Sequence, residues 1–82
     1  MAIELHILYF ASLAETADTD TETINVDDGT PLGVVYQILK DKHGFKMTDD
    51  KLAVAINHHM ANWQSPIKDG DIIAFIPPVA GG

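Results

Sequence analysis

One long amphipathic helix is the feature that most constrains the fold of this 82-residue chain. The helix is predicted to begin at a favourable N-cap, Thr30, with Pro31 in the first helical position, and to end at a left-handed C-cap, Gly44. Its predicted buried stripe consists of Leu32, Val35, Ile38 and Leu39. A single helix of about three turns cannot enclose a core alone, so we expect it to cover one face of a sheet.

Four segments around the helix have the alternation or the apolar runs of β-strands, and the segment around Met60 is a candidate for a fifth. The four predicted strands are residues 3–10, 19–26, 51–57 and 72–76. The order β–β–α–β–(β)–β predicts an α+β protein with the β-grasp, or ubiquitin-like, arrangement. We expect a mixed sheet of about four to five strands, with the one main helix packed on one face and the first strand beside the last.

Two connections and the third strand carry further expectations. Residues 11–16 could form a short helical turn or a loop, and residues 45–50 are expected to form a polar loop. In the third strand, Ala53 and Ala55 alternate with larger apolar residues. We therefore expect these two small side chains to face outward.

Two prolines follow the last strand, and they end it because proline cannot donate to a ladder. Residues 1–78 are therefore predicted to form one β-grasp domain, and residues 79–82 an extended, flexible C-terminal tail that ends in Gly81-Gly82. Glycine has no Cβ and tolerates positive φ, so both glycines can follow a narrow channel in another protein. The two prolines stiffen the exit and reduce the entropy lost on insertion.

The carboxylate of Gly82 is the group that we expect to carry chemistry. A carboxylate is a poor acyl donor, since its leaving group would be oxide, so ATP-dependent adenylation is the natural activation. A sulfur donor can then displace AMP and leave a thiocarboxylate on Gly82, while Gly81 clears its path. The absence of cysteine excludes disulfides, thiolate metal ligands and a catalytic cysteine, and it agrees with sulfur held on the C-terminus.

Charge and hydropathy argue against several other classes of function. The formal charge is −7, from 12 acidic side chains against 5 basic ones, all lysine. This balance argues against nucleic-acid binding, which depends on basic contacts to phosphate. No stretch is long enough to cross a membrane, and the N-terminus lacks a signal pattern, so we expect no membrane contact and a cytoplasmic location.

The four histidines do not have the spacing of a metal site. The adjacent side chains of His58 and His59 are expected to point apart, and His6 and His43 have no partner at ligand spacing. We interpret all four as solvated surface residues and predict neither a metal site nor a bound cofactor.

Three segments of the sequence resemble a known family, the small subunits of molybdopterin synthase. They are the ending KDGDIIAFIPPVAGG from Lys68, the segment ILYFASLAE from Ile7 and the segment LAVAIN from Leu52. The resemblance covers essentially the whole chain. It departs from the family pattern at Ala14, where the family often has Arg, and at Ile76, where it commonly has a second aromatic residue.

The resemblance implies a function and partners. An E1-like activating enzyme would consume ATP to adenylate Gly82, and a sulfur donor protein would supply the sulfur of the thiocarboxylate. The tail would then enter the large subunit, which transfers sulfur to cyclic pyranopterin monophosphate in molybdenum cofactor biosynthesis. The family complex is a heterotetramer with two small subunits at the ends of a large-subunit dimer. The chain would not be an enzyme on its own, because the large subunit supplies the catalytic side chains.

The surface that docks on the partner is predicted from strand alternation and from the resemblance together. Leu8 and Phe10 face away from the helix, and the last strand presents its own alternate residues there if Ile73 and Phe75 point inward. Met60 joins them because the family uses its position for partner contact. The predicted partner-binding residues are Leu8, Phe10, Met60, Ile72, Ala74, Ile76, Pro77, Pro78, Val79 and Ala80.

Three alternatives stay open at this point. The first is a related β-grasp sulfur carrier that serves thiamine, tungsten-pterin or tRNA thiolation. The second is a ubiquitin-like protein modifier whose Gly82 forms isopeptide bonds with lysines. The third is a plain binding module with an inert tail.

Overall fold

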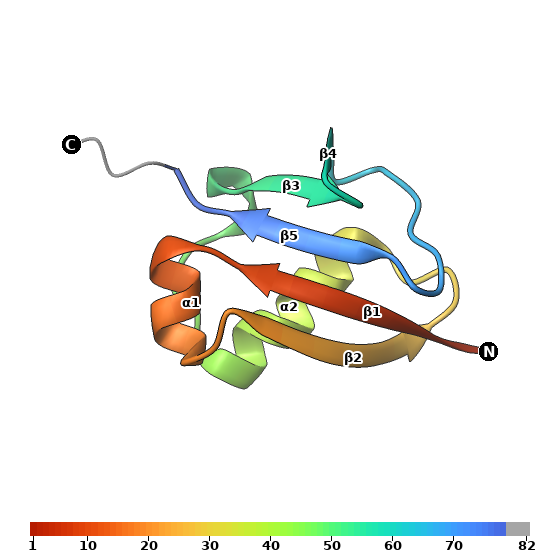
Figure 1. Cartoon of the computed structure of the whole chain (residues 1–82), viewed down its shortest axis with the longest axis horizontal. Coiled ribbons are helices and arrows are strands. Elements are labelled where there is room, and N and C mark those ends of the chain that lie inside the picture. Colours follow the sequence, from red (N-terminus) through yellow and green to blue (C-terminus); the bar gives the residue numbers. More distant parts are fainter. Residues whose placement is uncertain (79–82) are drawn as a thin grey trace.

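The computed structural model describes residues 1–78, which form a five-stranded mixed sheet with two α-helices (Figure 1). The elements are β1 (Ala2–Tyr9), α1 (Ala11–Ala17), β2 (Thr21–Asp27), α2 (Leu32–His43), the short 3₁₀ turn η1 (Asp49–Lys51), β3 (Ala53–Ile56), β4 (His59–Ala61) and β5 (Ile72–Ile76). The strand order is β2-β1-β5-β3-β4, with β1 and β5 parallel and the other pairs antiparallel. This is the predicted β-grasp arrangement, with the first strand beside the last. Neither helix within residues 1–78 combines the length and the apolar character needed to span a membrane.

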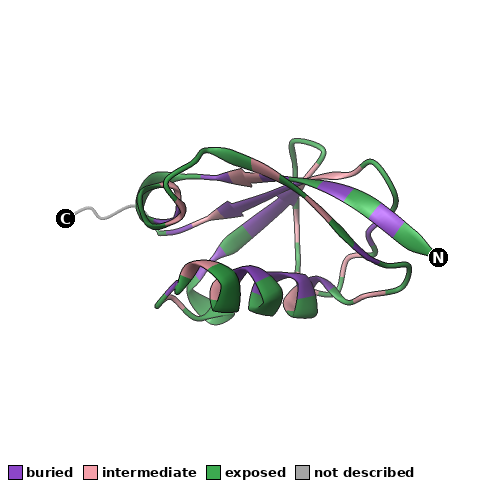
Figure 2. Cartoon of the chain, turned by 90° about the horizontal axis from the view of Figure 1, so that it is seen from below, coloured by how far each residue is buried: buried purple, intermediate pink, exposed green. Residues whose placement is uncertain are grey.

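The core lies between the sheet and α2, which crosses one face of it (Figure 2). The central strands contribute alternate residues that are fully buried, as the period of a strand requires. The innermost side chains are Leu5, Ile7, Ile73 and Phe75 from the sheet and Leu32, Val35, Tyr36 and Leu39 from the helix. Within residues 1–78, no helix crosses the opposite face of the sheet (Figure 2).

The predicted helix is present, but its buried stripe and its N-terminus differ from expectation. Ile38 is 45% exposed, and Tyr36 takes the core position because it lies on the same side as Leu32 and Leu39. The hydroxyl of Thr30 donates to the carbonyl of Asp27 over 2.6 Å, so Thr30 closes the preceding turn and does not cap the helix. The left-handed C-cap at Gly44, with φ of 74°, is confirmed.

The two connections and the third strand agree only in part with expectation. Residues 11–16 belong to a helix, α1, and not to a loop. The polar loop expected at residues 45–50 is wrong for Phe45, which is 4% exposed and stacks on the ring of Tyr36. Ala53 is exposed as expected, but Ala55 is buried, because β4 and β5 flank it on both sides and its methyl group is too small to emerge between them.

Candidate functional site

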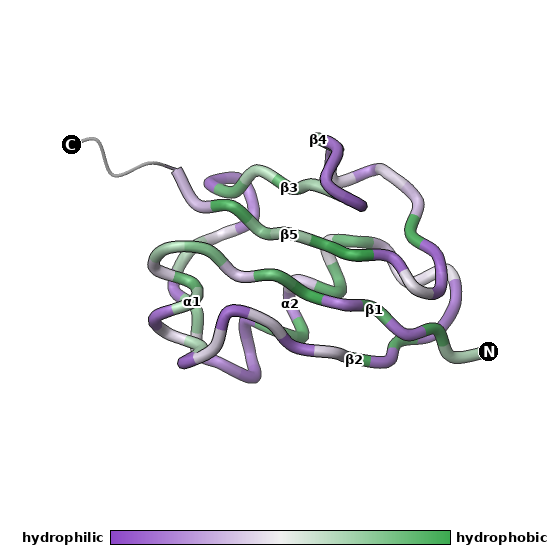
Figure 3. The backbone as a smooth tube through the Cα atoms, in the orientation of Figure 1, coloured by the Kyte–Doolittle hydropathy of each residue, from purple (hydrophilic) through white to green (hydrophobic). Residues whose placement is uncertain are grey.

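The face of the sheet opposite α2 carries an apolar row that crosses four strands. Because Ile73 and Phe75 are fully buried beneath the helix, the residues between and beside them point to the other face. The register then joins the strands in one row, Leu8–Ala74–Ala55–Met60. Figure 3 shows the hydrophobic character of β1 and β5 in the middle of the sheet. We call this surface the open face.

The predicted docking residues within residues 1–78 lie on or next to the open face, with graded exposure. Met60 is 71% exposed and Phe10 45%, so both present large apolar surfaces to solvent. Leu8, Ile72 and Ile76 are half-buried; Ala74 and Pro77 are buried, and Pro78 is exposed. The predicted residues Val79, Ala80, Gly81 and Gly82 lie outside the described residues.

A pocket of about 510 Å³ lies where β5 ends and the chain continues toward the glycines. Its lining consists of Phe10, Ala11, Ser12, Glu15, Ile76, Pro77 and Pro78. One wall comes from α1 and the other from the end of β5, which lie at the same end of the molecule (Figure 1). This site, which we call the root pocket, joins the two prolines to the exposed ring of Phe10 in one mostly apolar surface.

Sequence reasoning missed three residues of the root pocket: Ala11, Ser12 and Glu15. Residues 11–16 fit either a short helical turn or a loop, so the sequence assigns no side chain of this segment to a face. Ala11 has φ of 50°, a left-handed value that turns the chain sharply from β1 into α1. This turn brings α1 against the end of β5 and thereby closes one side of the pocket.

The turn between β3 and β4 positions Met60. Asn57 and His58 both have positive φ, 52° and 70°, as a two-residue hairpin turn requires. The side chain of Asn57 is held on both sides, since its Nδ2 donates to Asp71 and its Oδ1 accepts from the N–H of Ile72, each over 2.9 Å. The turn is therefore tied to the start of β5, and β4 presents Met60 at a fixed place on the open face.

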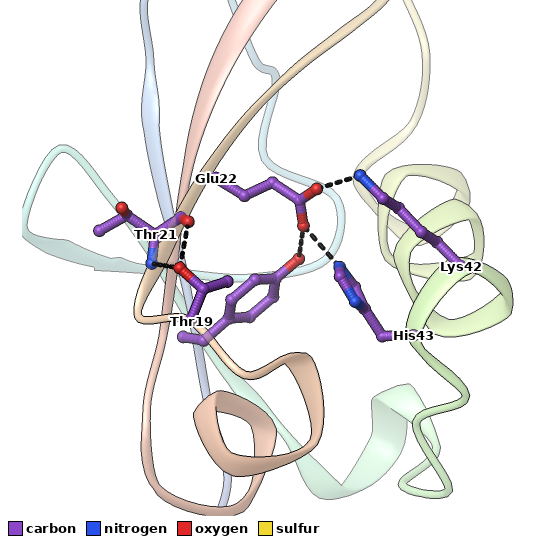
Figure 4. Close-up of polar contacts among 6 residues, drawn as sticks. Thr19, Thr21, Glu22, Lys42 and His43 are labelled. Atoms are coloured by element: carbon purple, nitrogen blue, oxygen red, sulfur yellow. Dashed lines mark hydrogen bonds and ion pairs between the residues drawn. The ribbon is translucent and has the colours of Figure 1, made fainter.

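A polar cluster lies under the other side of the sheet and was not predicted. Glu22 of β2 accepts hydrogen bonds from the hydroxyl of Tyr9 over 2.5 Å and from Nε2 of His43 over 2.6 Å, and it pairs with Lys42 (Figure 4). The interpretation of His43 as a solvated surface residue is therefore wrong: its side chain is 14% exposed. No sequence signal pointed to this cluster, because Glu22 and His43 are separated by a helix and a turn.

The cluster perturbs two ionisations. Burial of Glu22 opposes its charged form, but the bonds from Lys42, Tyr9 and His43 outweigh that effect and lower the pKa of Glu22 to about 2. Burial, followed by the bond to the Glu22 carboxylate, raises the pKa of Tyr9 well above its usual value. Glu22 is therefore ionised and Tyr9 neutral throughout the physiological range. We interpret the cluster as a structural contact that holds β2 against the end of α2.

The exposed histidines His58, in the β3–β4 turn, and His59, at the start of β4, do not combine with other potential ligands. Within residues 1–78, no group of three or more histidine or acidic side chains is arranged to hold a metal ion.

The root pocket is lined by one carboxylate, one hydroxyl and otherwise apolar groups. Such a lining is suited to apolar contact with a protein segment.

The fold and the position of this site define a ubiquitin-like protein of the β-grasp class, with an apolar surface at the end of β5, the last strand before the Gly-Gly ending in the sequence. The ThiS family model matches residues 7–82. The chain belongs to the ThiS family.

Relatives over the full length support this assignment. The molybdopterin synthase sulfur carrier subunit of Mycobacterium tuberculosis is 35% identical, over 98% of this chain and 99% of its own length. A chain in the protein–protein complex of subunits 1 and 2 of the molybdopterin-converting factor from Helicobacter pylori is 31% identical, with a TM-score of 0.68. The match covers 98% of this chain and 100% of that chain. Small archaeal modifier protein 1 from H. volcanii is 26% identical, with a TM-score of 0.80, over 94% of this chain and 99% of its own.

Proposed function

We propose that this chain is the sulfur-carrier subunit of a molybdopterin synthase in molybdenum cofactor biosynthesis. The observation that carries the proposal is the root pocket, in which an exposed aromatic ring lies with the two prolines that precede the Gly81-Gly82 ending by two residues in the sequence. The full-length similarity to a sulfur carrier subunit of that synthase supports it.

In this function Gly82 is the reactive residue, and the folded domain is the part that the partner proteins bind. An E1-like enzyme consumes ATP to adenylate the Gly82 carboxylate, and a sulfur donor protein displaces AMP to leave a thiocarboxylate. Gly81 has no side chain to obstruct insertion of the tail into an acceptor channel. The chain binds no cofactor of its own and acts in the cytoplasm as a carrier that is consumed and recharged.

The acceptor is the large subunit, which supplies the catalytic side chains for transfer of sulfur to cyclic pyranopterin monophosphate. We assign its docking surface to the open face and the root pocket, with Phe10 and Met60 as the exposed apolar anchors. A similar chain has been solved in a complex of subunits 1 and 2 of a molybdopterin-converting factor, which supports a two-subunit assembly. A heterotetramer with two copies of each subunit is the expected stoichiometry.

The function is tested by mass spectrometry of the chain after incubation with its cognate activating enzyme, ATP and a sulfur donor. The expected product differs from the starting chain by one exchange of oxygen for sulfur at Gly82. A chain that lacks Gly82 is the matched control, and it should fold and bind the large subunit but deliver no sulfur. If the complete chain gains no sulfur from a competent activator, or the shortened chain still delivers it, the proposal is wrong.

A second candidate function is protein modification through an isopeptide bond from Gly82 to lysine side chains. The similarity to small archaeal modifier protein 1 favours it. Expression of a tagged chain in its own host, followed by a denaturing gel, distinguishes the two functions. Covalent conjugates of high mass that vanish when Gly82 is removed would support modification, while a single band would favour the carrier alone.

A further inference from the structure

The sheet ends in two edge strands that are built differently. β4 has three residues, which leaves little backbone for another strand to pair with. β2 has seven, Thr21–Asp27, and contains neither proline nor lysine, the residues that commonly protect an edge. Within residues 1–78, β2 pairs with β1 alone, so its other side is the sheet's accessible edge.

The register shows which backbone groups face that edge. The N–H of Tyr9 donates to the carbonyl of Asp20 over 2.8 Å, and residues of β2 alternate between bonding to β1 and pointing away from it. The even-numbered residues therefore bond to β1. The N–H and C=O groups of Thr23 and Asn25 point outward, where they form a template for one more strand.

An apolar line on α2 runs beside this edge. Val34, Ile38 and Lys42 lie one turn apart along the helix, and the contact of Lys42 with Glu22 places the line on the β2 side. Val34 is 47% exposed and Ile38 is 45% exposed, although both are large aliphatic side chains. Ile24, on the inner side of β2, is half-buried and adds to the same surface.

We propose that β2 and this line of α2 form a docking site for an extended segment of a partner protein. The segment adds to the five-stranded sheet beside β2, with its backbone paired to Thr23 and Asn25. Aliphatic side chains at alternate positions of the segment pack on Val34 and Ile38. The α2 line is on the far side of the sheet from the open face, and the row of the open face does not include β2. The proposal therefore goes beyond the carrier function and does not depend on the tail.

The charges around the site define the ends of the segment. Asp27, Asp28 and Asp41 are exposed near it, while Lys42 is already paired with Glu22. The matching segment therefore carries lysine or arginine beside its aliphatic residues. A second copy of this chain fits poorly, because each copy has a formal charge of −7 and the two would repel.

The probe for this site is a synthetic peptide as long as β2, in which isoleucine alternates with threonine and a lysine stands at each end. Titration into the ¹⁵N-labelled full chain should give saturable NMR shifts at the amides of Thr23 and Asn25 and at the methyl groups of Ile38. Those two amides should also exchange more slowly with solvent. No saturable shift at millimolar peptide, or shifts centred on the open face, would overturn the proposal. Shifts of the same amides with rising protein concentration alone would also overturn it, by making a second copy the occupant.

Two pairs of variants separate docking from folding. Thr23→Pro removes an outward N–H while every backbone bond to β1 is kept, and should weaken peptide binding at least tenfold. Thr23→Val loses the same hydroxyl contact with His6 but keeps the N–H, and should bind like the wild type. Ile38→Lys, at an exposed position, should weaken binding to a similar extent. Gln37→Lys adds the same charge on the solvent side of the helix and is its control. Equal binding by Ile38→Lys and Gln37→Lys would contradict the proposal.

Discussion

The two faces of the central strands β1 and β5 differ in burial. On the inner face, Leu5, Ile7 and Phe75 are fully buried against α2. On the outer face, Leu8 and Ile76 are half-buried, and the row ends at the exposed Met60. Because neighbouring residues of a strand point to opposite faces, one short segment of sequence encodes both the buried core and the proposed docking surface. Substitutions one residue apart should therefore affect different measurements.

The largest effect on stability is expected on the inner face. Phe75→Ala removes a buried ring that contacts the rings of Tyr36 and Trp63, at centroid distances of 5.2 and 5.8 Å. It should lower the free energy of unfolding by roughly 3–5 kcal/mol. Met60→Ala, on the outer face, should change it by less than about 0.5 kcal/mol. Urea denaturation of both variants measures the contrast, and equal losses would show that the open face also carries the fold.

A smaller loss is expected from the polar cluster beneath the inner face. Glu22→Gln removes the charge that pairs with Lys42 and should cost about 1–3 kcal/mol at neutral pH. The pKa of Glu22 is about 2 in the folded chain against a usual value of 4.5, so its stabilisation is fully present above pH 4.5 and is lost as the pH falls toward 2. Thermal unfolding between pH 6 and about pH 2 should therefore show a shallower decline for the variant. The control is Glu15→Gln, at an exposed position, whose thermal stability should fall with pH as in the wild type. Identical curves for Glu22→Gln and the wild type would show that the Glu22 carboxylate does not stabilise the fold.

The outer face should affect affinity and leave stability alone. Phe10→Ala and Met60→Ala should each weaken binding to the large subunit by about tenfold, since exposed large apolar residues are the usual anchors of an interface. Isothermal titration calorimetry gives the affinity. Val34→Ala, at an apolar position that is about as exposed as Phe10 but lies on the helix side, should bind the large subunit normally. Loss of affinity in Val34→Ala alone would move the docking surface to the helix side.

The smallest effect is expected at a position where helical spacing alone is misleading. Ile38→Ala should change the free energy of unfolding by less than about 0.5 kcal/mol, because its side chain is exposed. Leu39→Ala, at the next and fully buried residue, should cost about 2–5 kcal/mol. Chemical denaturation of the pair tests whether the stripe of α2 faces the sheet as described.

Sequence patterns predicted the parts of the fold that depend on local alternation. The inward side chains Ile73 and Phe75, the strand 72–76 and the cap at Gly44 follow from period, β-propensity and glycine's tolerance of positive φ. The order of elements was sufficient to predict the β-grasp sheet, because one helix and a run of strands leave few ways to enclose a core.

Contacts between distant segments could not be predicted in the same way. Ile38 and Tyr36 both fit a helical stripe, and only the position of Phe45 and the rest of the sheet decides which one is buried. The bond between Glu22 and His43 joins two elements whose relative placement has no sequence signature. The same holds for the root pocket, since no local pattern shows that α1 lies against the end of β5.

The position of β5 has a mechanical consequence. β5 is parallel to β1 on one side and antiparallel to β3 on the other, so it is gripped along both edges. Tension applied at Pro78 along the strand loads both ladders in shear, and their hydrogen bonds must yield together and not one after another. A carrier whose end is held by a partner can thus be pulled free without unravelling, because the load falls on a strand that is paired on both sides.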